Sequence, residues 1–179
     1  MIELTRIPKS DLRLRVWMAD HYSKPRGFVG RQLIYLVSVR GVVYGATVAG
    51  SAGLFLPGRN EFFPGASIHK IVNNTFFHIS KKGGSYPVRN FATAIVAKFR
   101  SVVALDWPLN YGDDVEGWET LVEPPRTGEL YLRDGWQHVG TTKGFTCRRV
   151  AGPGTDDYSG ARVWDTKNLH PKLVFARKL

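Results

Sequence analysis

The stretch GELYLRDGWQHVGTTKG, residues 128–144, decides the fold that the sequence predicts. Residues 128–134 are expected to form a short helix, which Gly135 ends because glycine readily adopts the left-handed backbone found after helices. Trp136–Val150 is then predicted to form a hairpin that turns near Lys143–Gly144. A short helix that leads directly into strands indicates helices packed on a sheet.

Hydrophobic periodicity on either side of this stretch supplies the other elements. Apolar residues at helical spacing predict helices at Asp11–Tyr22, capped by Ser10, and at Phe91–Ala104, capped by Asn90. The acidic stretch Asp106–Gly117 is expected to be irregular. Strands are predicted at Gln32–Val39, Val42–Val48, His69–Ile79, Gly117–Glu123 and Lys172–Ala176. This order predicts an α/β (α+β) fold, with a mixed central β-sheet flanked by helices, in a single domain of residues 1–179.

The composition excludes several classes of protein. Hydrophobic residues make up 43% of the 179 residues, which is too many for a disordered chain. Cys147 is the only cysteine, so the chain has no internal disulfide and no cysteine-rich zinc site. No apolar run approaches the ~18 residues of a spanning helix, and the N-terminus lacks the apolar core of a signal peptide. We therefore expect no membrane partner and a location in the bacterial host cytoplasm.

Charge is the most informative bulk property of the chain. The formal net charge is +10, yet residues 105–134 hold two basic and eight acidic side chains. A strongly basic protein is expected to bind a polyanion, and double-stranded DNA is the leading candidate, although a merely basic soluble protein has the same composition. The side chains expected to contact phosphates are Lys24, Arg26, Arg31, Lys81, Lys82, Arg148 and Arg149.

The opening stretch also resembles the C-terminal motif of the GCN5-related N-acetyltransferase (GNAT) family. The resemblance lies in Tyr131, Gly135, Trp136, Val139 and Gly140. It implies a GNAT-like fold in which the tyrosine gives a proton to the leaving thiolate of the acyl donor, a role that the phenol of Tyr131 suits. A tyrosine that merely packs beneath the sheet is the alternative interpretation.

The same resemblance implies residues that bind the donor. Adjacent asparagines are unusual in a strand, and Asn73–Asn74 therefore indicate the bulge at which GNAT backbone amides grip the donor. Asn90 and Thr93 open the following helix, whose N-terminus would face the pyrophosphate of acetyl-coenzyme A. The Lys81–Ser85 loop contains glycines but departs from the usual GNAT phosphate-binding pattern.

A wider resemblance links the chain to the Mom-like phage DNA-modification proteins, a divergent branch of this fold. It is carried by His21–Ser23, Gly30–Leu33, Asn73–Thr75, Thr120–Pro124, Gly135–Gly144 and Arg162–Leu169. It implies a transferase that converts adenine N6 in DNA to a carbamoylmethyl derivative and so protects phage DNA from restriction. The donor would be acetyl-coenzyme A or a glycine-derived or aminoacyl compound. Shorter segments, Val72–Thr75, Asn90–Thr93 and Glu119–Pro124, also resemble a family of Druantia-type antiviral systems.

Four side chains are the further catalytic candidates beside Tyr131. His21 could be a base or a metal ligand near neutral pH, and Tyr22 follows it. Glu123, at the end of a strand, could act as a base, and Asn73 could pair with an adenine edge. Each also has a purely structural interpretation. Iron bound by His21, Tyr22 and a carboxylate is conceivable, but the spacing does not support it, so the metal is unknown.

Three functions remain open at this point. The first is the DNA adenine-modifying transferase. The second is a coenzyme A-dependent N-acetyltransferase that acts on another amine. The third is a non-catalytic nucleic-acid-binding subunit of a defence system.

Overall fold

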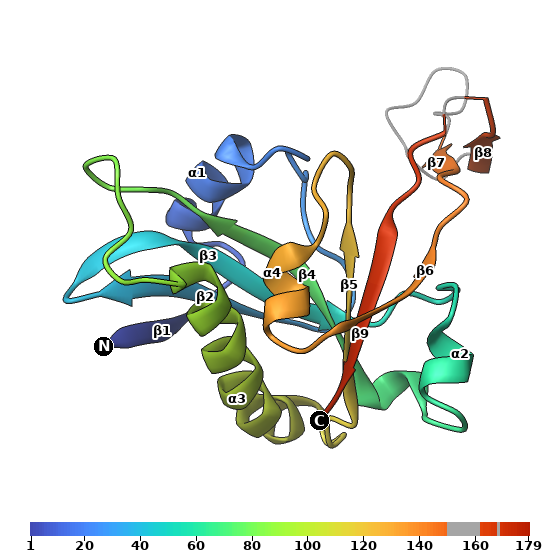
Figure 1. The fold of residues 1–179 in the computed structure, drawn as a ribbon, viewed down its shortest axis with the longest axis horizontal. Coiled ribbons are helices and arrows are strands. Elements are labelled where there is room, and N and C mark those ends of the chain that lie inside the picture. Colours follow the sequence, from blue (N-terminus) through green and yellow to red (C-terminus); the bar gives the residue numbers. More distant parts are fainter. Residues whose placement is uncertain (150–161, 168) are drawn as a thin grey trace.

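The structure is a computed structural model that describes residues 1–149, 162–167 and 169–179. A mixed sheet of seven strands runs through its centre, in the order β1-β2-β3-β4-β5-β9-β6 (Figure 1). These strands are β1 (Ile2–Ile7), β2 (Gln32–Val39), β3 (Val42–Ser51), β4 (Ile71–Ile79), β5 (Gly117–Val122), β9 (Leu173–Lys178) and β6 (Gln137–Thr141). Only β4 and β5 are parallel neighbours, and every other pair in this sheet is antiparallel. The predicted mixed α/β fold is confirmed.

Helices cover both faces of the sheet. On one face α1 (Leu12–Asp20) packs Leu14 and Met18 against Phe76 and its neighbours on β2 and β3. On the other face α3 (Phe91–Tyr111) and α4 (Glu129–Arg133) close the main core, in which Phe99 lies against Trp118. The short helices α2 (Arg59–Phe62) and η1 (Ile68–Lys70) lie between β3 and β4, and none of the described helices is long and apolar enough to cross a membrane.

The sheet is split at its centre. Strands β4 and β5 pair only from Ile71–Asn73 to Gly117–Glu119, although β4 continues to Ile79 and β5 to Val122. Strand β4 also bulges against β3, where Asn74 pairs with Ala49 and Phe76 with Val48, so that Thr75 between them has no partner. The bulge that Asn73–Asn74 predicted is therefore present, one residue further along. Such a bulge bends and twists its strand, which suits the divergence of β4 from β5.

Four expectations about the elements were wrong. The N-cap of α1 is Asp11, whose carboxylate accepts a hydrogen bond from the Arg13 backbone, and not Ser10. Helix α3 continues through half of the stretch expected to be irregular, because Trp107 is buried in the core. The first strand, β1, was missed; it alternates along the sheet edge and pairs with β2. The cap is a local contact, whereas the longer α3 and the added β1 reflect packing against residues distant in sequence.

The predicted hairpin at Trp136–Val150 is the fourth error. Strand β6 pairs with β9, while β7 (Thr146–Arg149) pairs with β8 (Arg162–Asp165) in a separate two-stranded sheet (Figure 1). The basic tail supplies β9, whose Val174 and Phe175 are buried between β5 and β6. Burial of these two apolar side chains brings the end of the chain into the middle of the sheet.

Candidate active site

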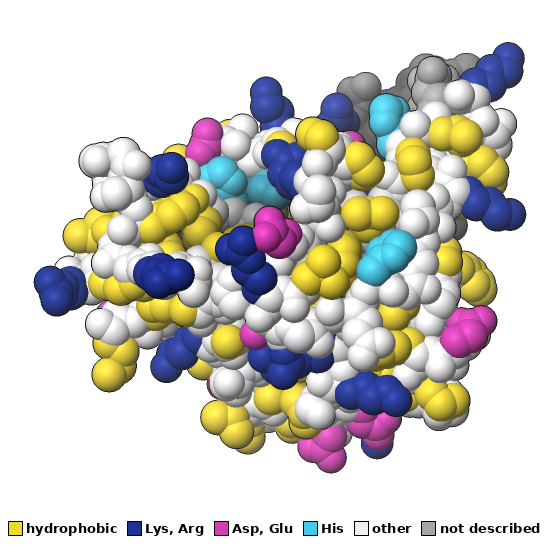
Figure 2. Space-filling view, in the orientation of Figure 1, with side chains coloured by type: hydrophobic (Ala, Val, Ile, Leu, Met, Phe, Trp, Pro, Cys, Tyr) yellow, Lys and Arg dark blue, Asp and Glu magenta, His cyan; other side chains and the backbone are white. Residues whose placement is uncertain are grey.

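The split between β4 and β5 opens into a cavity of about 900 Å³. Its lining comes from β4, from β5, from residues 125–131 that lead into α4, and from residues 20–23 that follow α1. Both Phe76, which packs with α1, and Phe77, which packs toward α3, line it. The cavity therefore reaches both faces of the sheet through the split. Figure 2 shows it as a hollow with histidine side chains recessed in it and Lys or Arg side chains near its rim.

Tyr131 stands at the base of this split. Its hydroxyl donates a hydrogen bond of 2.7 Å to the side-chain oxygen of Asn74 on β4. Asn74 is held in turn, because its amide nitrogen donates to the Thr47 hydroxyl at 3.1 Å and its backbone carbonyl oxygen accepts from the Thr120 hydroxyl at 2.9 Å. Burial raises the pKa of Tyr131, so the phenol keeps its proton at neutral pH.

Tyr131 is neither sealed in the core nor free in solvent. Only 6% of the residue is exposed, and its ring packs against Trp136 and Phe175. The residue nevertheless lines the cavity. A buried phenol that faces a cavity and has a fixed partner is suited to give a proton to a group bound there.

The edge of β4 that faces the split carries backbone groups without a strand partner, although the Asn74 carbonyl accepts from the Thr120 hydroxyl. Beyond Asn73 no described strand pairs with this edge, and Thr75 at the bulge has no partner on β3 either. Exposed N–H and C=O groups on a strand edge bind extended, amide-containing chains by adding a strand. This part of the cavity can therefore hold a linear ligand with peptide-like amides.

His21 and Tyr22 reach the cavity from the α1 side, opposite α4. The His21 ring is buried against Phe76, and its Nδ1 lies 2.8 Å from the Ser23 hydroxyl. Burial, followed by the nearby His78 and Arg126, lowers the pKa of His21 to about 4. The imidazole is therefore neutral at pH 7, where it can accept or donate a hydrogen bond but carries no charge.

Tyr22 is stacked under a cation that the sequence analysis did not single out. The guanidinium of Arg126 lies 3.4 Å from the centre of the Tyr22 ring. Arg126 belongs to the loop between β5 and α4, so this contact joins segments on opposite sides of the cavity. Its position in the acidic band, directly after two prolines, is the only sequence signal that could have identified it.

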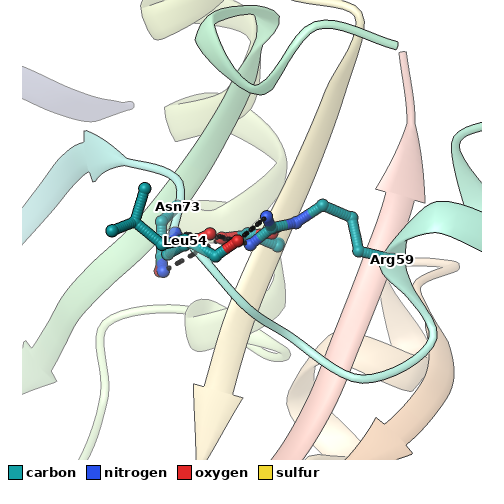
Figure 3. A network of polar contacts seen from close by, with 5 residues as sticks. Leu54, Arg59 and Asn73 are labelled. Atoms are coloured by element: carbon teal, nitrogen blue, oxygen red, sulfur yellow. Dashed lines mark hydrogen bonds and ion pairs between the residues drawn. The ribbon is translucent and has the colours of Figure 1, made fainter. Parts of the chain in front are cut away.

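Asn73 lies in a buried polar network at the closed end of the split. Glu119 is 1% exposed and forms an ion pair of 2.8 Å with Arg59, while its other oxygen accepts hydrogen bonds from Gly53 and, at 3.4 Å, from Asn73 (Figure 3). Burial raises the pKa of Glu119 despite the opposing effect of Arg59. The network attaches the loop after β3 to β5. Asn73 also lines the cavity, and its catalytic role stays a prediction.

Glu123 lies outside the lining of this first cavity. Its carboxylate is half-buried, pairs with Lys172 at 3.5 Å, and faces a second cavity of about 980 Å³. Leu121 and Lys172 line both cavities, which places the second one beside the first. Glu123 and Tyr131 therefore face different cavities.

The predicted donor-binding residues are only partly brought together. Asn74 lines the first cavity, whereas Asn90 and Thr93 lie at the start of α3, outside its lining. The long loop that follows β4 separates them from the cavity in the sequence, and the role of Asn90 and Thr93 in donor binding stays a prediction.

The cations predicted to bind DNA are dispersed over several segments. Lys81 lies 5.7 Å from the Tyr86 ring centre and Lys82 lies 5.3 Å from that of Trp17, in the loop that follows β4. Arg31 pairs with Asp113 and stacks on Tyr111. Lys24 and Arg26 are exposed in the loop after α1, and the side chains of Arg148 and Arg149 lie outside the described part of the structure.

The residues that the structure describes include no group of three or more His, Cys, Asp and Glu side chains that could hold a metal ion. His78 is paired with Asp20 at 2.9 Å and with Ser80 at 3.1 Å. The iron site considered from the sequence therefore finds no ready set of ligands around His21 in this part of the chain.

Comparison with known proteins defines the class of fold. No protein-family model and no curated protein match the sequence. A GNAT family acetyltransferase from Elizabethkingia anophelis with acetyl-CoA bound aligns over 99% of this chain and 98% of its own, with 10% identity and a TM-score of 0.54. The IAA acetyltransferase from Bacillus cereus aligns over the whole of both chains, with 14% identity and a TM-score of 0.52. An aminoglycoside acetyltransferase, AAC(6')-Ib in complex with coenzyme A, aligns over 99% of this chain and 95% of its own, with 12% identity and a TM-score of 0.59.

The protein has the GNAT acetyltransferase fold. The fold expected from Tyr131 and the residues after it is confirmed. At these identities the likeness concerns the fold alone, and the resemblance to the Mom-like proteins stays a prediction.

Proposed function

We propose that the protein is an N-acyltransferase that moves an acyl group from a coenzyme A-type thioester to an amine through the split between β4 and β5. The observation that carries this proposal is the Tyr131 hydroxyl, a buried proton donor fixed at the base of a cavity that reaches both faces of the sheet. The GNAT fold supports the reaction class.

The residues around the split fit a pantetheine thioester. The edge of β4 beyond Asn73 offers backbone N–H and C=O groups to the amides of the pantetheine arm, next to the bulge at which Thr75 has no partner on β3. Lys81 and Lys82 in the loop after β4 supply positive charge for the phosphates. When bound, the thioester supplies an acyl carbon already activated for attack.

The protein's own groups then divide between the two partners in the reaction. Tyr131 gives its proton to the sulfur as the carbon–sulfur bond breaks, and the proton of the amine passes to solvent water as the carbon–nitrogen bond forms. The Tyr131 phenolate then takes up a proton from water, which restores the resting state. Neutral His21, on the α1 side, can accept a hydrogen bond from the incoming amine. Tyr131 thus acts on the leaving sulfur and His21 on the attacking nitrogen, from opposite faces of the sheet.

The test uses the purified protein, acetyl-CoA and a panel of amines, with thiol release as the readout. We expect acetyl-CoA to bind in calorimetry and thiol release to depend on both the amine and Tyr131. Failure of acetyl-CoA to bind at millimolar concentration, with no thiol released from any amine, contradicts the proposal.

A specific observation favours a second candidate, in which the acceptor is adenine N6 in DNA. With a thioester donor the product of this candidate is an N6-acylated deoxyadenosine, because the acyl carbon itself bonds to N6. The chain carries a net charge of +10, and cations occur on three loops that also contribute, or directly follow, residues of the cavity lining. These cations are Lys24 and Arg26, Lys81 and Lys82, and Arg126. Such a rim suits a phosphate backbone from which a base is extruded into the cavity.

Mass spectrometry of nucleosides from DNA of expressing bacteria tests this second candidate. A modified deoxyadenosine that disappears in the Tyr131→Phe variant supports it. DNA binding without any modified nucleoside would instead favour the non-catalytic nucleic-acid-binding function.

A further inference from the structure

The second cavity is built from segments that the proposed chemistry does not use. One wall is the loop after β3, from Leu54 to Asn60, and the other comprises residues 142–145 after β6 together with Trp164, His170 and Lys172. Its volume of about 980 Å³ is at the upper end of the range for small-molecule sites. The cavity can therefore hold a ligand the size of a nucleotide.

Exposed aromatic side chains border this cavity. Phe55 is 92% exposed, Trp164 is 58% exposed and Phe145 is 45% exposed, although each lines the cavity. Leu54 beside them is 76% exposed. Large apolar side chains that gather at an exposed hollow mark a binding site, and flat aromatic faces favour a planar ring.

The wall formed by residues 142–145, Trp164, His170 and Lys172 also carries polar and basic side chains, and two hydrogen bonds from backbone amides hold it in place. The Lys172 amide donates to the Thr142 hydroxyl at 2.9 Å, and the His170 amide donates to the Gly144 carbonyl at 2.9 Å. The positive charge of Lys172 is balanced by its ion pair with Glu123. The ammonium of Lys143, in contrast, has no hydrogen-bond or ion-pair partner among the residues that the structure describes. This wall is thus expected to attract an anionic group.

We propose that the second cavity binds the acceptor, and that the acceptor is a planar aromatic molecule carrying an acidic group. The ring would pack on Phe55 and Trp164, and the acid would face Lys143. This inference rests on the proposed acyl transfer, because Leu121 and Lys172, which line both cavities, mark where the acceptor's amine would enter the first one.

Calorimetric titration of the full chain, without acetyl-CoA, tests the binding directly. The probes are adenosine monophosphate and 4-aminobenzoate, which distinguish a phosphate source of the acid from a carboxylate source, together with adenosine and inorganic phosphate. We expect at least one aromatic acid to bind at least ~10-fold more tightly than adenosine or phosphate alone. Equal affinity for adenosine and adenosine monophosphate, combined with no binding of 4-aminobenzoate, overturns the proposal.

Two variants locate the site. Phe55→Ala and Lys143→Ala change exposed side chains, so both variants should fold. Each should lower the affinity for the aromatic acid by ~10-fold. The matched controls on the other face are Leu109→Ala, at a residue that is 84% exposed, and Lys98→Ala, which should leave the affinity unchanged. Loss of affinity in Arg126→Ala but not in Lys143→Ala would place the ligand at the first cavity, which Arg126 lines, and would overturn the inference.

The fluorescence of Trp164 gives a second readout. Trp107, Trp118 and Trp136 are buried, and the partly exposed Trp17 on α1 lies outside the lining of this cavity. Quenching by the bound ring should therefore be largely lost in Trp164→Phe. Binding without thiol release would leave this inference standing while the proposed function fails. Thiol release with aliphatic amines, without binding of any aromatic acid, would support the proposed acyl transfer and overturn this inference.

Discussion

The hydroxyl of Tyr131 and the side-chain oxygen of Asn74 are joined by a hydrogen bond of 2.7 Å at the point where β4 and β5 part. Asn74 is itself fixed by Thr47 and Thr120, so the position of the phenol is set by both strands of the split. A proton donor held in this way needs little reorganisation when a leaving group enters the cavity.

Replacement of this phenol is the first prediction. Tyr131→Phe should lower the rate of thiol release by at least ~100-fold, because the leaving sulfur loses its proton donor. The free energy of unfolding should fall by only about 1–3 kcal/mol, since Asn74 loses one buried hydrogen bond. Enzyme kinetics and chemical denaturation measure the two effects.

Tyr86→Phe is the matched control, because Tyr86 is partly exposed and lies outside both cavities. Burial raises the pKa of Tyr131, so wild-type activity should show no alkaline fall from loss of its proton below about pH 10. A Tyr131→Phe variant with the wild-type rate would refute the role.

The buried ion pair gives a prediction about stability. Arg59→Met leaves Glu119 buried without its charged partner and should lower the free energy of unfolding by about 3–5 kcal/mol. The double variant with Glu119→Leu should recover part of that loss, because no uncompensated charge remains. Urea denaturation is the measurement.

Arg133→Met is the comparison, because the Arg133–Glu129 pair is exposed on both sides. Arg133→Met should therefore lower the free energy of unfolding by less than ~1 kcal/mol. Equal effects at Arg59 and Arg133 would show that the buried network does not stabilise the fold.

Acidification should destabilise the protein through His21. Its folded pKa of about 4 lies below the unfolded value of 6.5, so between these values the unfolded chain binds the additional proton. The contribution of His21 to stability is therefore complete above about pH 6.5 and is lost progressively as the pH falls toward 4. His21→Asn should flatten this dependence in melting curves recorded from pH 4 to pH 7. A variant with the same pH dependence as wild type would assign the effect to other groups.

Gly128, which precedes α4, tests how closely the backbone approaches the core. A Cβ at this position would lie 2.2 Å from the Phe175 ring, whereas at Gly112 nothing lies within 4 Å, and both glycines have φ of +75°. Gly112→Ala should lower the free energy of unfolding by about 1–2 kcal/mol, from backbone strain alone. Gly128→Ala should cost about 1–3 kcal/mol more, since the ring or α4 must move.

Activity provides the second readout for this pair of variants. Displacement of α4 also displaces Tyr131, so Gly128→Ala should lose thiol release while Gly112→Ala retains it. Two variants with equal stability and equal activity would contradict the close packing of Gly128 on Phe175.

Salt dependence tests the cationic rim. If Lys24, Arg26, Lys81 and Lys82 bind phosphates, their replacement by alanine should reduce the slope of log K against log salt by about 0.9 for each phosphate that is no longer neutralised. Fluorescence anisotropy with labelled duplex DNA measures the slope. The Lys98→Ala control on α3 should leave the slope unchanged. If Lys98→Ala reduced the slope as much as replacement of one of the four loop cations, the DNA would be attracted by the net charge alone and not by these cations.

Local patterns in the sequence were sufficient for most of the elements that surround the site. The apolar runs predicted as strands at Gln32–Val39, Val42–Val48 and Gly117–Glu123, and the apolar stripe predicted as a helix at Phe91–Ala104, were recognisable because each is a property of a short segment. Neighbouring asparagines in an otherwise β-branched strand also indicated the bulge. Arg126 was missed because a single arginine in an acidic loop resembles any solvated surface residue.

The sequence by itself determined that helices pack on a mixed sheet and that Tyr131 comes after the central strands β4 and β5 along the chain. Periodicity and turn residues are local properties of the chain, so both could be read without the structure. Only the tertiary structure decided that β9 inserts between β5 and β6, that β4 and β5 separate after three residue pairs, and that His21 faces the same cavity as Tyr131 from the other side. These features depend on burial shared among distant segments, and no local pattern records which distant segment supplies the partner.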